Sequence, residues 1–158
     1  MNDIHHPAAQ GAADVPADDA RKLKILILSQ YFWPEGFRVN DLASELIARG
    51  HEVTVLTGLP NYPDGEVFSD FRENPEKYAS FEGAAVHRVP VIPRGNSSLK
   101  LMLNYLSFAL SGTIFGPGKL RGQRFDAIFV FQTSPITSAL PALWIGWRKR
   151  APVLMWVL

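Results

Sequence analysis

Hydrophobic residues occur along the chain either in short continuous runs or at the spacing of one helix face. The clearest structural prediction comes from residues 24–57, where a run, a helical spacing and a second run follow one another. Residues 24–29 form a short unbroken apolar run, which is typical of a parallel strand covered on both faces. Residues 53–57 form a second apolar run. Between them, apolar residues recur at the spacing of one helix face, at Val39, Leu42, Ala43, Leu46 and Ile47. The pattern predicts a strand, a helix that stops at Arg49-Gly50, and a second strand, joined as a right-handed crossover.

Apolar runs typical of strands and apolar spacings typical of helices also occur in the rest of the chain, and they complete the fold prediction. Segment 66–82 is charged and aromatic, and we expect a surface segment with a short helix. The sequence therefore predicts an α/β fold, a Rossmann-like parallel sheet with helices on both faces. Further strands are expected at 84–91 (its end pushed toward a sheet edge by Pro90), 126–131 and 153–158, and further helices at about 97–115, capped by Ser97 or Ser98, and 136–147.

Two loops follow the carboxyl ends of the first two predicted strands, where open parallel sheets bind ligands. In the loop 30–38, three aromatic residues precede Pro34, Glu35 and Gly36, and a glycine near a helix start allows a ligand to approach the backbone. The aromatic residues are suited either to contact a sugar or lipid or to cover the end of the sheet. The motif G-x-G-x-x-G is absent, as is a phosphate-binding P-loop.

The second loop, 58–65, contains two prolines and two glycines and predicts a rigid, irregular turn. Asn61 and Tyr62 within it offer donors and acceptors that suit a hydroxyl-rich ligand, although a purely structural turn explains them equally well. A third loop follows the strand at 126–131. Thr133 and Ser134 there are candidates for the same crevice, and helix capping is sufficient to explain Ser134.

The predicted helix at 97–115 carries a wide apolar face. It is shorter than the roughly 20 residues needed to span a bilayer, so it could lie on a membrane or pack within the protein, and we expect burial with part of this face presented to a membrane. Four cations near it would each contribute on the order of 1 kcal/mol to the free energy of binding to anionic lipid. The apolar stripe comprises Leu99, Met102, Leu103, Leu106, Ala109 and Leu110, and the cations are Lys100, Lys119, Arg121 and Arg124.

Charge divides the chain into two unlike parts. Residues 1–93 contain 8 Lys/Arg and 14 Asp/Glu (net −6), whereas 94–158 contain 8 Lys/Arg and the single acid Asp126 (net +7). A basic half of this kind is suited to bind an anionic surface or ligand. A basic face that is simply exposed to solvent explains the charge equally well. Residues 1–22 have no apolar periodicity and lack a signal-peptide pattern, which predicts a disordered leader and a cytoplasmic protein.

Metal and thiol chemistry find little support in the composition. The 158-residue chain contains no cysteine, so disulfides and thiolate metal sites are excluded, and a reducing compartment is expected. The four histidines (His5, His6, His51 and His87) are scattered without the i, i+4 spacing of a helical zinc site. We therefore expect no metal site and no cofactor, and the sequence assigns no catalytic residue.

Three motifs taken together resemble a known enzyme family. SQYFWPEG, LASELIARGHEVTVLTG and PNYPDG occur in the order seen in the amino-terminal half of family 4 glycosyltransferases. The closest resemblance is to L-fucosamine and colanic-acid-type transferases of bacterial capsule, O-antigen and exopolysaccharide synthesis. RGHEV alone recurs in many glycosyltransferases, whereas TGLPNYPDG combined with SQYFWPEG is much more specific. The resemblance covers residues 24–158.

The resemblance implies the GT-B fold, in which two Rossmann-like domains face a cleft and transfer proceeds without metal and with retention of configuration. The second domain holds the nucleotide-sugar donor and the first holds the acceptor. The family's glycine loop falls on Pro34, Glu35 and Gly36, where many members have two adjacent glycines and this chain has one. Residues 23–158 are thus expected to be an acceptor-side domain, incomplete at its carboxyl end and apparently truncated.

The function expected from this resemblance is the acceptor-side half of a glycosyltransferase in surface polysaccharide biosynthesis, inactive as this isolated chain. Its partners would be a lipid-linked glycan, a nucleotide sugar bound with the missing domain, and an anionic inner membrane surface, with no nucleic acid. The alternative is a non-catalytic glycan- or glycolipid-binding half-domain that acts with a separate subunit. An unrelated nucleotide-binding α/β domain is disfavoured by the absence of a phosphate loop.

Overall fold

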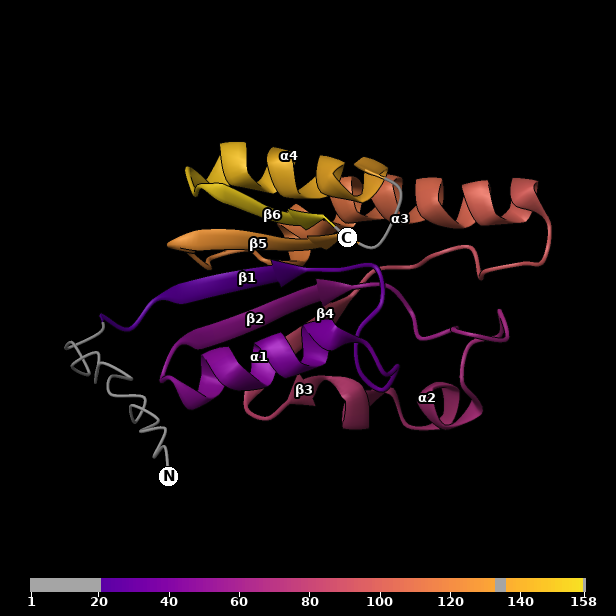
Figure 1. The fold of residues 1–158 in the computed structure, drawn as a ribbon, viewed down its shortest axis with the longest axis horizontal. Helices are drawn as coiled ribbons and strands as arrows, with labels where there is room; N and C mark the ends of the chain where they lie inside the picture. The colour runs from indigo at the N-terminus through magenta and orange to yellow at the C-terminus, as the bar shows by residue number, and fades with distance from the viewer. Residues whose placement is uncertain (1–20, 133–135, 158) are drawn as a thin grey trace, which may run out of the picture.

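A six-stranded sheet lies between two layers of helices (Figure 1). The computed structural model describes residues 21–132 and 136–157. The strands are β1 (Lys24–Leu28), β2 (Glu52–Thr57), β3 (Ser80–Phe81), β4 (Ala84–Arg88), β5 (Ala127–Gln132) and β6 (Val153–Val157). The helices are α1 (Arg38–Ala48), α2 (Ser69–Glu73), α3 (Ser98–Lys119) and α4 (Ala139–Lys149), with 3₁₀ turns η1 (Pro75–Tyr78) and η2 (Ile136–Ser138).

The sheet confirms the predicted α/β class. Its strand order is β3-β4-β2-β1-β5-β6, and every neighbouring pair is parallel except β3 and β4. The chain runs outward from β1 in one direction to β4, and α3 then carries it across to β5 on the other side of β1. Because β1 lies next to both β2 and β5, the loops that follow these three strands leave the sheet at the same edge.

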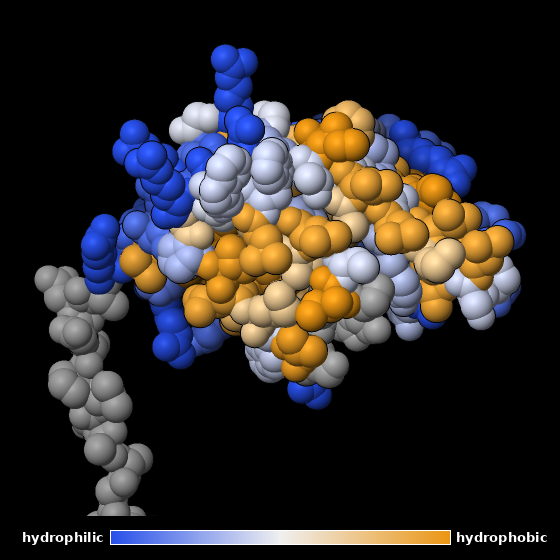
Figure 2. Space-filling view, turned by 90° about the horizontal axis from the view of Figure 1, so that it is seen from above, coloured by the Kyte–Doolittle hydropathy of each residue, from blue (hydrophilic) through white to orange (hydrophobic). Residues whose placement is uncertain are grey.

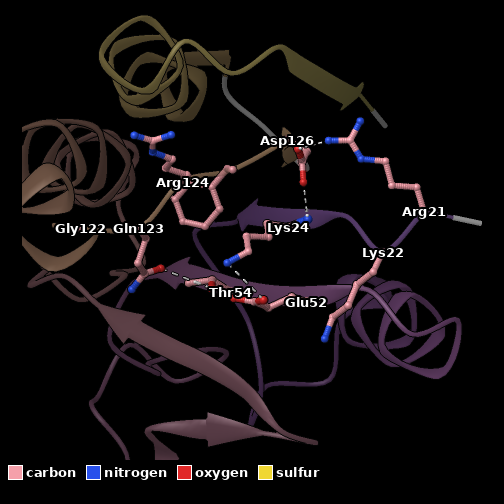
Figure 3. Close-up of a pocket in the computed structure, with 10 residues that line it drawn as sticks. Arg21, Lys22, Lys24, Glu52, Thr54, Gly122, Gln123, Arg124 and Asp126 are labelled. Carbon is pink, nitrogen blue, oxygen red and sulfur yellow. Dashed lines mark hydrogen bonds and ion pairs between the residues drawn. The ribbon is translucent and has the colours of Figure 1, made fainter.

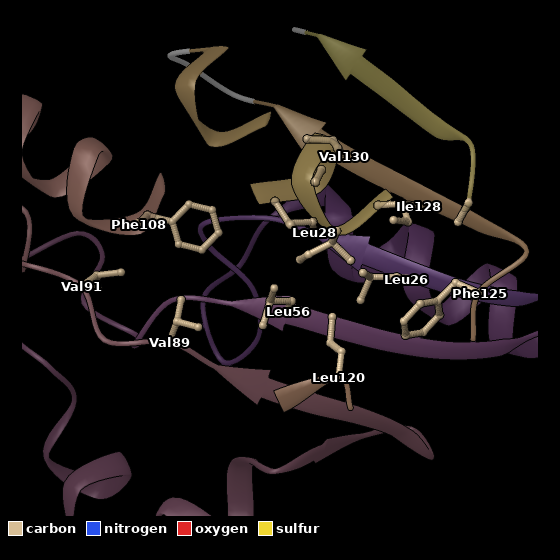
Figure 4. Packing of buried hydrophobic residues seen from close by; sticks show 13 residues of the cluster. Leu26, Leu28, Leu56, Val89, Val91, Phe108, Leu120, Phe125, Ile128 and Val130 are labelled. Atoms are coloured by element: carbon tan, nitrogen blue, oxygen red, sulfur yellow. The ribbon is translucent and has the colours of Figure 1, made fainter. Parts of the chain in front are cut away.

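Alternation along β1 shows how one strand supports both helix layers. Ile25 and Ile27 pack in a buried cluster with Val39 and Ala43 of α1. The intervening Leu26 and Leu28 face the other layer, where Phe108 of α3 and Ile145 of α4 lie in the second buried cluster (Figure 4). Successive strand residues point to opposite faces of a sheet, so a continuous apolar run is what a doubly covered strand requires.

Two predicted helix ends are confirmed by backbone geometry. Gly50 has φ +85°, the left-handed region in which glycine ends a helix without steric cost, and its N–H donates to the Ile47 carbonyl at 2.9 Å. Ser97 caps α3, since its hydroxyl accepts from the Lys100 N–H at 3.3 Å. These caps fix where the chain enters and leaves the helices that flank the sheet.

The third predicted strand is shorter than expected, and its neighbour was missed. The strand expected at 84–91 ends at Arg88, and Pro90 lies beyond it. Strand β3 pairs antiparallel outside β4 through Ser80 and Ala85, so β4 is not at the edge. At two residues, β3 is too short to produce an apolar alternation in the sequence.

Helix α3 buries a different side from its apolar stripe. Its fully buried positions include Asn104 and Phe108, whereas Leu99, Leu110 and Ile114 are 61–66% exposed. The helix approaches α4 through small residues: a Cβ added at Gly112 would lie 2.9 Å from the Pro141 Cβ. Small residues allow this close contact and leave the large apolar side chains outside. No helix among the described residues is long and apolar enough to cross a membrane.

Candidate functional site

The loops after β1 and β2 meet at the carboxyl edge of the sheet through the side chain of Glu35. Its Oε1 accepts hydrogen bonds from the backbone N–H of Asn61 at 2.9 Å and of Tyr62 at 2.7 Å. Its Oε2 accepts from the backbone N–H of Phe32 at 3.3 Å. Glu35 is 3% exposed, so the carboxylate acts as an internal clamp and does not face solvent.

Burial raises the pKa of the Glu35 carboxyl above its ordinary value, although the three backbone N–H groups and the charge of Arg88 act in the opposite direction. Arg88, at the end of β4, donates to the Gly58 carbonyl at 3.0 Å and to the Trp33 carbonyl at 2.5 Å. Burial also lowers the pKa of Arg88 to about 10. A buried acid and a half-buried base therefore hold the same pair of loops.

Asn61 is buried, and its side chain forms hydrogen bonds within the protein. Its Nδ2 donates to the Leu59 carbonyl at 2.7 Å, and its Oδ1 accepts from the backbone N–H of Arg94 at 2.9 Å. This second bond connects the loop after β2 to the connection between β4 and α3. Asn61 thus holds the shape of the crevice, which is the structural role that the sequence left open for it.

Tyr62 is a predicted site residue whose side chain faces solvent, with 37% of its surface exposed. Its ring contacts those of Tyr31 and Phe37, with centroids 5.7 and 5.1 Å away. The guanidinium of Arg94 lies over the same ring, with Cζ 5.4 Å from the centroid. An aromatic face beside a cation and a phenol is suited to bind a sugar ring and an anionic group.

A fully buried amide in α3 completes the floor of this region. Asn104 Oδ1 accepts from Gln30 Nε2 at 2.7 Å and from the Tyr31 hydroxyl at 2.9 Å. Asn104 Nδ2 donates to the Ile92 carbonyl at 2.6 Å. Burial raises the pKa of Tyr31 to about 12, so its hydroxyl stays protonated and remains a donor to Asn104.

The remaining predicted residues of the first loop lie at its surface or support it. Gly36 is exposed, and a Cβ added there would meet nothing within 4 Å. Pro34 is half-buried. Of the aromatic residues before it, Tyr31 and Phe32 are buried, and the Trp33 ring packs at a tilt against the Tyr78 ring with centroids 5.0 Å apart. The structure therefore favours the interpretation in which these rings cover the end of the sheet.

Thr133 and Ser134 lie outside the described residues, and so does most of the predicted leader at 1–22. The helix expected at 136–147 is present as η2 followed by α4, which continues to Lys149. Gln132, the last residue of β5, pairs with Val157 at the same edge of the sheet as the two clamped loops.

A charged hollow at the opposite edge of the sheet lies among the first residues of the strands (Figure 3). Its charges are largely paired: Lys24 Nζ lies 3.5 Å from Glu52, and Arg21 lies 3.7 Å from Asp126. Asp126 also accepts from the Lys24 N–H at 2.8 Å. These contacts join the strand starts to one another, and parallel sheets bind ligands at the other edge.

The described residues contain no group of three or more His, Asp and Glu side chains placed to hold a metal ion. His87 on β4 lies beside Gln123, with 3.3 Å between His87 Nε2 and Gln123 Nε2. His51 Nδ1 accepts from the Leu23 N–H at 3.4 Å. Both histidines thus have structural partners within the fold.

Two residues of this region escaped the sequence prediction. Arg94 follows the third predicted strand, and the rule that placed the first two loops at the crevice applies equally to this one. In the sequence, Asn104 is a polar residue that interrupts the apolar face of the helix expected at 97–115. A polar residue within such a face is a signal for a buried hydrogen-bond network, but the sequence does not show which partners it has.

Comparison with known proteins assigns the chain to a protein family. The model of the family described as the glycosyl transferase 4-like domain matches residues 36–157. The chain therefore belongs to the glycosyl transferase 4-like family, as the sequence motifs predicted. It is 37% identical over 95 residues to a protein of Escherichia coli (strain K12) assigned to colanic acid biosynthesis as the glycosyl transferase WcaI. That match covers 56% of this chain and 23% of the relative.

Two solved structures have the same fold. The glycotransferase of kitacinnamycin aligns with 87% of this chain at a TM-score of 0.58 and 16% identity. LpCGTa in complex with UDP aligns with 86% at a TM-score of 0.56 and 16% identity. In each case the chain covers 30% of the solved structure. The mostly parallel sheet with helices on both faces is thus the arrangement found in one part of these larger glycosyltransferases.

Proposed function

We propose that this chain is the acceptor-side half of a retaining glycosyltransferase that moves a sugar from a nucleotide-sugar donor to a lipid-linked glycan in surface polysaccharide biosynthesis. The observation that carries the proposal is the contact of Arg94 with the Tyr62 ring at the carboxyl edge of the sheet, on loops held by Glu35 and Asn61. Family membership supports the same chemistry.

The crevice is suited to positioning, which is the task of an acceptor site. Three loops that leave neighbouring strands are joined by the Glu35 and Asn61 hydrogen bonds, so the Tyr62 ring is held before a ligand arrives. Positioning of an acceptor hydroxyl is worth roughly 7–11 kcal/mol of a barrier. In this proposal no side chain of the chain acts as acid or base, and a second domain supplies the donor and the groups that stabilise its leaving diphosphate.

Binding experiments with the 158-residue chain test whether it binds the acceptor and leaves the donor to a second domain. We expect it to bind a lipid-linked glycan and not a nucleotide sugar, as measured by isothermal titration calorimetry in detergent micelles. Tyr62→Ala should weaken glycan binding about tenfold, which corresponds to loss of roughly 1.4 kcal/mol. Phe115→Ala, at an exposed aromatic residue of α3 away from the crevice, should leave it unchanged. Binding of the nucleotide sugar without the glycan would contradict the proposal.

Activity measurements test the remaining parts. We expect no sugar transfer by a homogeneous sample of this chain with any nucleotide sugar, and turnover by such a sample would refute the assignment as an inactive half. Joined to a donor-binding domain of the same family, the chain should transfer with retention, read as the anomeric configuration of the product by NMR. Glycan binding with no transfer by any such pairing would instead favour the non-catalytic module.

Peripheral attachment to the inner face of the plasma membrane is the final part of the proposal. Apolar side chains gather on the face that carries α3 and α4, with blue, hydrophilic side chains around their ends (Figure 2). On α4, Trp147 is 72% exposed and Trp144 stacks on it at 5.2 Å. Tryptophan is favoured at the interface between lipid and water. The cations available to anionic lipid are Lys100 and Lys119 on α3, Arg121 and Arg124 after it, and Arg148 and Arg150 at the end of α4.

Liposome flotation tests this attachment. The chain should float with vesicles that contain anionic lipid, and binding should fall when Trp147 is replaced by Gln or when salt is raised. Trp33→Gln is not a suitable control because Trp33 is packed against Tyr78. The exposed Ile92→Gln, outside α3 and α4, serves instead. Flotation that is indifferent to lipid charge would contradict an anionic membrane partner.

A further inference from the structure

Two apolar hollows lie along the exposed side of α3, and they share Leu106 in their walls. The first lies near the start of the helix, against Leu101, Met102 and Tyr105. The second lies between α3 and α4, where Leu110 and Ile114 face Leu143, Trp144 and Trp147. Because both are lined by Leu106, the two hollows are neighbours along α3, and together they are called the trench, which is part of the apolar face seen in Figure 2.

The trench has the length and composition of a site for one hydrocarbon chain. From Ser98 in the first hollow to Ile114 in the second, α3 rises about 24 Å at 1.5 Å per residue. Its walls are formed almost entirely by aliphatic and aromatic side chains. Burial of a chain of methylene groups against such walls is favourable by roughly 0.8 kcal/mol for each group.

One end of the trench adjoins the strand-edge crevice and a cation. Tyr105, in the wall of the first hollow, follows Asn104, whose Oδ1 accepts from the Tyr31 hydroxyl at 2.9 Å. The Tyr31 ring in turn lies 5.7 Å from the Tyr62 ring, measured between centroids. The Arg94 guanidinium also lies over the Tyr62 ring, 5.4 Å from its centroid. Lys100 approaches the same loop, since a Cβ at Gly95 would lie 2.4 Å from Lys100 Cδ.

These cations have no acidic partner within the part of the chain that the structure describes. The ion pairs there involve Arg21, Lys24, Arg49 and Lys77, and none includes Arg94 or Lys100. Glu35 is close to Tyr31 as well, but its carboxylate accepts three backbone hydrogen bonds. An arginine held in place with its charge unmatched is suited to a phosphate, which it can bind through two parallel hydrogen bonds.

We propose that the trench along α3 binds the hydrocarbon chain of a phosphorylated lipid and that Arg94 binds its phosphate beside Tyr62. This rests on the proposed function, which it deepens by identifying how a lipid-linked acceptor is recognised. The chain lies between α3 and α4, the phosphate lies at the strand edge, and the glycan extends from the phosphate into the crevice between the clamped loops.

The experiment measures binding of single-chain probes by the 158-residue protein below their micelle concentrations. The probes are dodecyl phosphate, the neutral dodecyl glucoside and inorganic phosphate, and affinity is read by isothermal titration calorimetry. A dodecyl phosphate brominated at the end of its chain reports chain position, because bromine quenches tryptophan at close range. We expect dodecyl phosphate to bind at least tenfold more tightly than dodecyl glucoside, inorganic phosphate to bind immeasurably weakly, and quenching to be lost in the double variant Trp144→Phe, Trp147→Phe.

Matched variants separate the two parts of the site. Arg94→Gln should weaken dodecyl phosphate about tenfold and leave dodecyl glucoside unchanged, whereas Arg72→Gln, the same exchange at an exposed position of α2, should affect neither. Leu110→Gln should weaken both surfactants, whereas Leu99→Gln should weaken neither. Leu110 and Leu99 are 63% and 61% exposed, and Leu99 lies outside the trench walls, so both variants should fold.

Several outcomes would overturn the inference. Equal affinity for the two surfactants, or no effect of Arg94→Gln, would exclude the phosphate site. Binding only to vesicles would mean that the face meets a bilayer surface, and a concentration-dependent dimer that excludes the probes would mean that it meets a second copy. Because no sugar transfer is measured, these results leave the proposed function standing. Selective phosphate binding without glycan binding would instead refute the proposed function alone.

Discussion

Glu35 and Asn61 are joined by a hydrogen bond of 2.9 Å from the Asn61 backbone N–H to the Glu35 carboxylate, although they are 26 residues apart in the chain. The same oxygen accepts from Tyr62 at 2.7 Å. Since Asn61 in turn binds the Arg94 N–H, one buried carboxylate fixes the first two strand-edge loops and, through Asn61, the third. The geometry of the crevice depends on this connection.

Replacement of Glu35 should therefore destabilise the protein through its loops. Glu35→Ala leaves the N–H groups of Asn61 and Tyr62 buried without an acceptor, which should lower the free energy of unfolding by about 2–4 kcal/mol. Gly36→Ala is the control, because a Cβ there meets nothing within 4 Å, and it should change stability by less than about 0.5 kcal/mol. Urea denaturation followed by circular dichroism measures both.

Stability should also carry a pH dependence from the Glu35 carboxyl. Burial raises its folded-state pKa above the unfolded value near 4.5, so the folded state binds the proton more tightly. The contribution to stability is therefore greatest below the unfolded pKa and falls as pH rises through the folded pKa. The free energy of unfolding of the wild-type chain relative to Glu35→Gln should decrease over that interval. A difference that is flat or increases with pH would contradict the raised pKa.

Asn104 should be the most sensitive polar position of α3. Asn104→Leu keeps the side-chain size but leaves Gln30 Nε2, the Tyr31 hydroxyl and the Ile92 carbonyl without their partner, which should lower the free energy of unfolding by about 2–4 kcal/mol. Asn96→Leu makes the same exchange at an exposed loop position and should cost less than about 0.5 kcal/mol. Equal effects in thermal unfolding would show that Asn104 is not a buried connector.

The contact between α3 and α4 gives a second matched pair. Gly112→Ala places a Cβ 2.9 Å from the Pro141 Cβ and should destabilise the protein by about 1–3 kcal/mol as the helices separate. Gly118→Ala lies in the same helix with nothing within 4 Å, and should stabilise it by up to about 1 kcal/mol because alanine favours helix. Differential scanning calorimetry should show opposite shifts in Tm.

Prediction from sequence succeeded where local periodicity carries the information. Continuous apolar runs identified β1, β2 and β5, and Gly50 and Ser97 marked helix ends, because strand and helix repeats and caps are local properties of the chain. It failed at β3, whose two residues owe their pairing to β4 and leave no repeat. The ends of elements also moved by one to four residues.

The candidate site was only partly accessible to such reasoning. The order of strands and loops placed Gly36, Asn61 and Tyr62 at one edge of the sheet, because parallel strands share a direction. It did not distinguish Tyr62, which faces solvent, from Glu35 and Asn61, which are buried in hydrogen bonds. Burial depends on contacts between residues far apart in the chain, and no local pattern reports it.

The sequence by itself determined the α/β class, the family motifs and the edge of the sheet at which the functional loops lie, since periodicity and chain order are written in the residues. Only the tertiary structure decided which face of α3 is buried. The apolar stripe at Leu99, Met102 and Leu110 lies outside, and Asn104 and Phe108 lie inside. The reason is steric: Gly112 brings α3 close to Pro141 of α4 on its buried side, and the large apolar side chains Leu110 and Ile114 lie on the exposed part of the groove between the two helices.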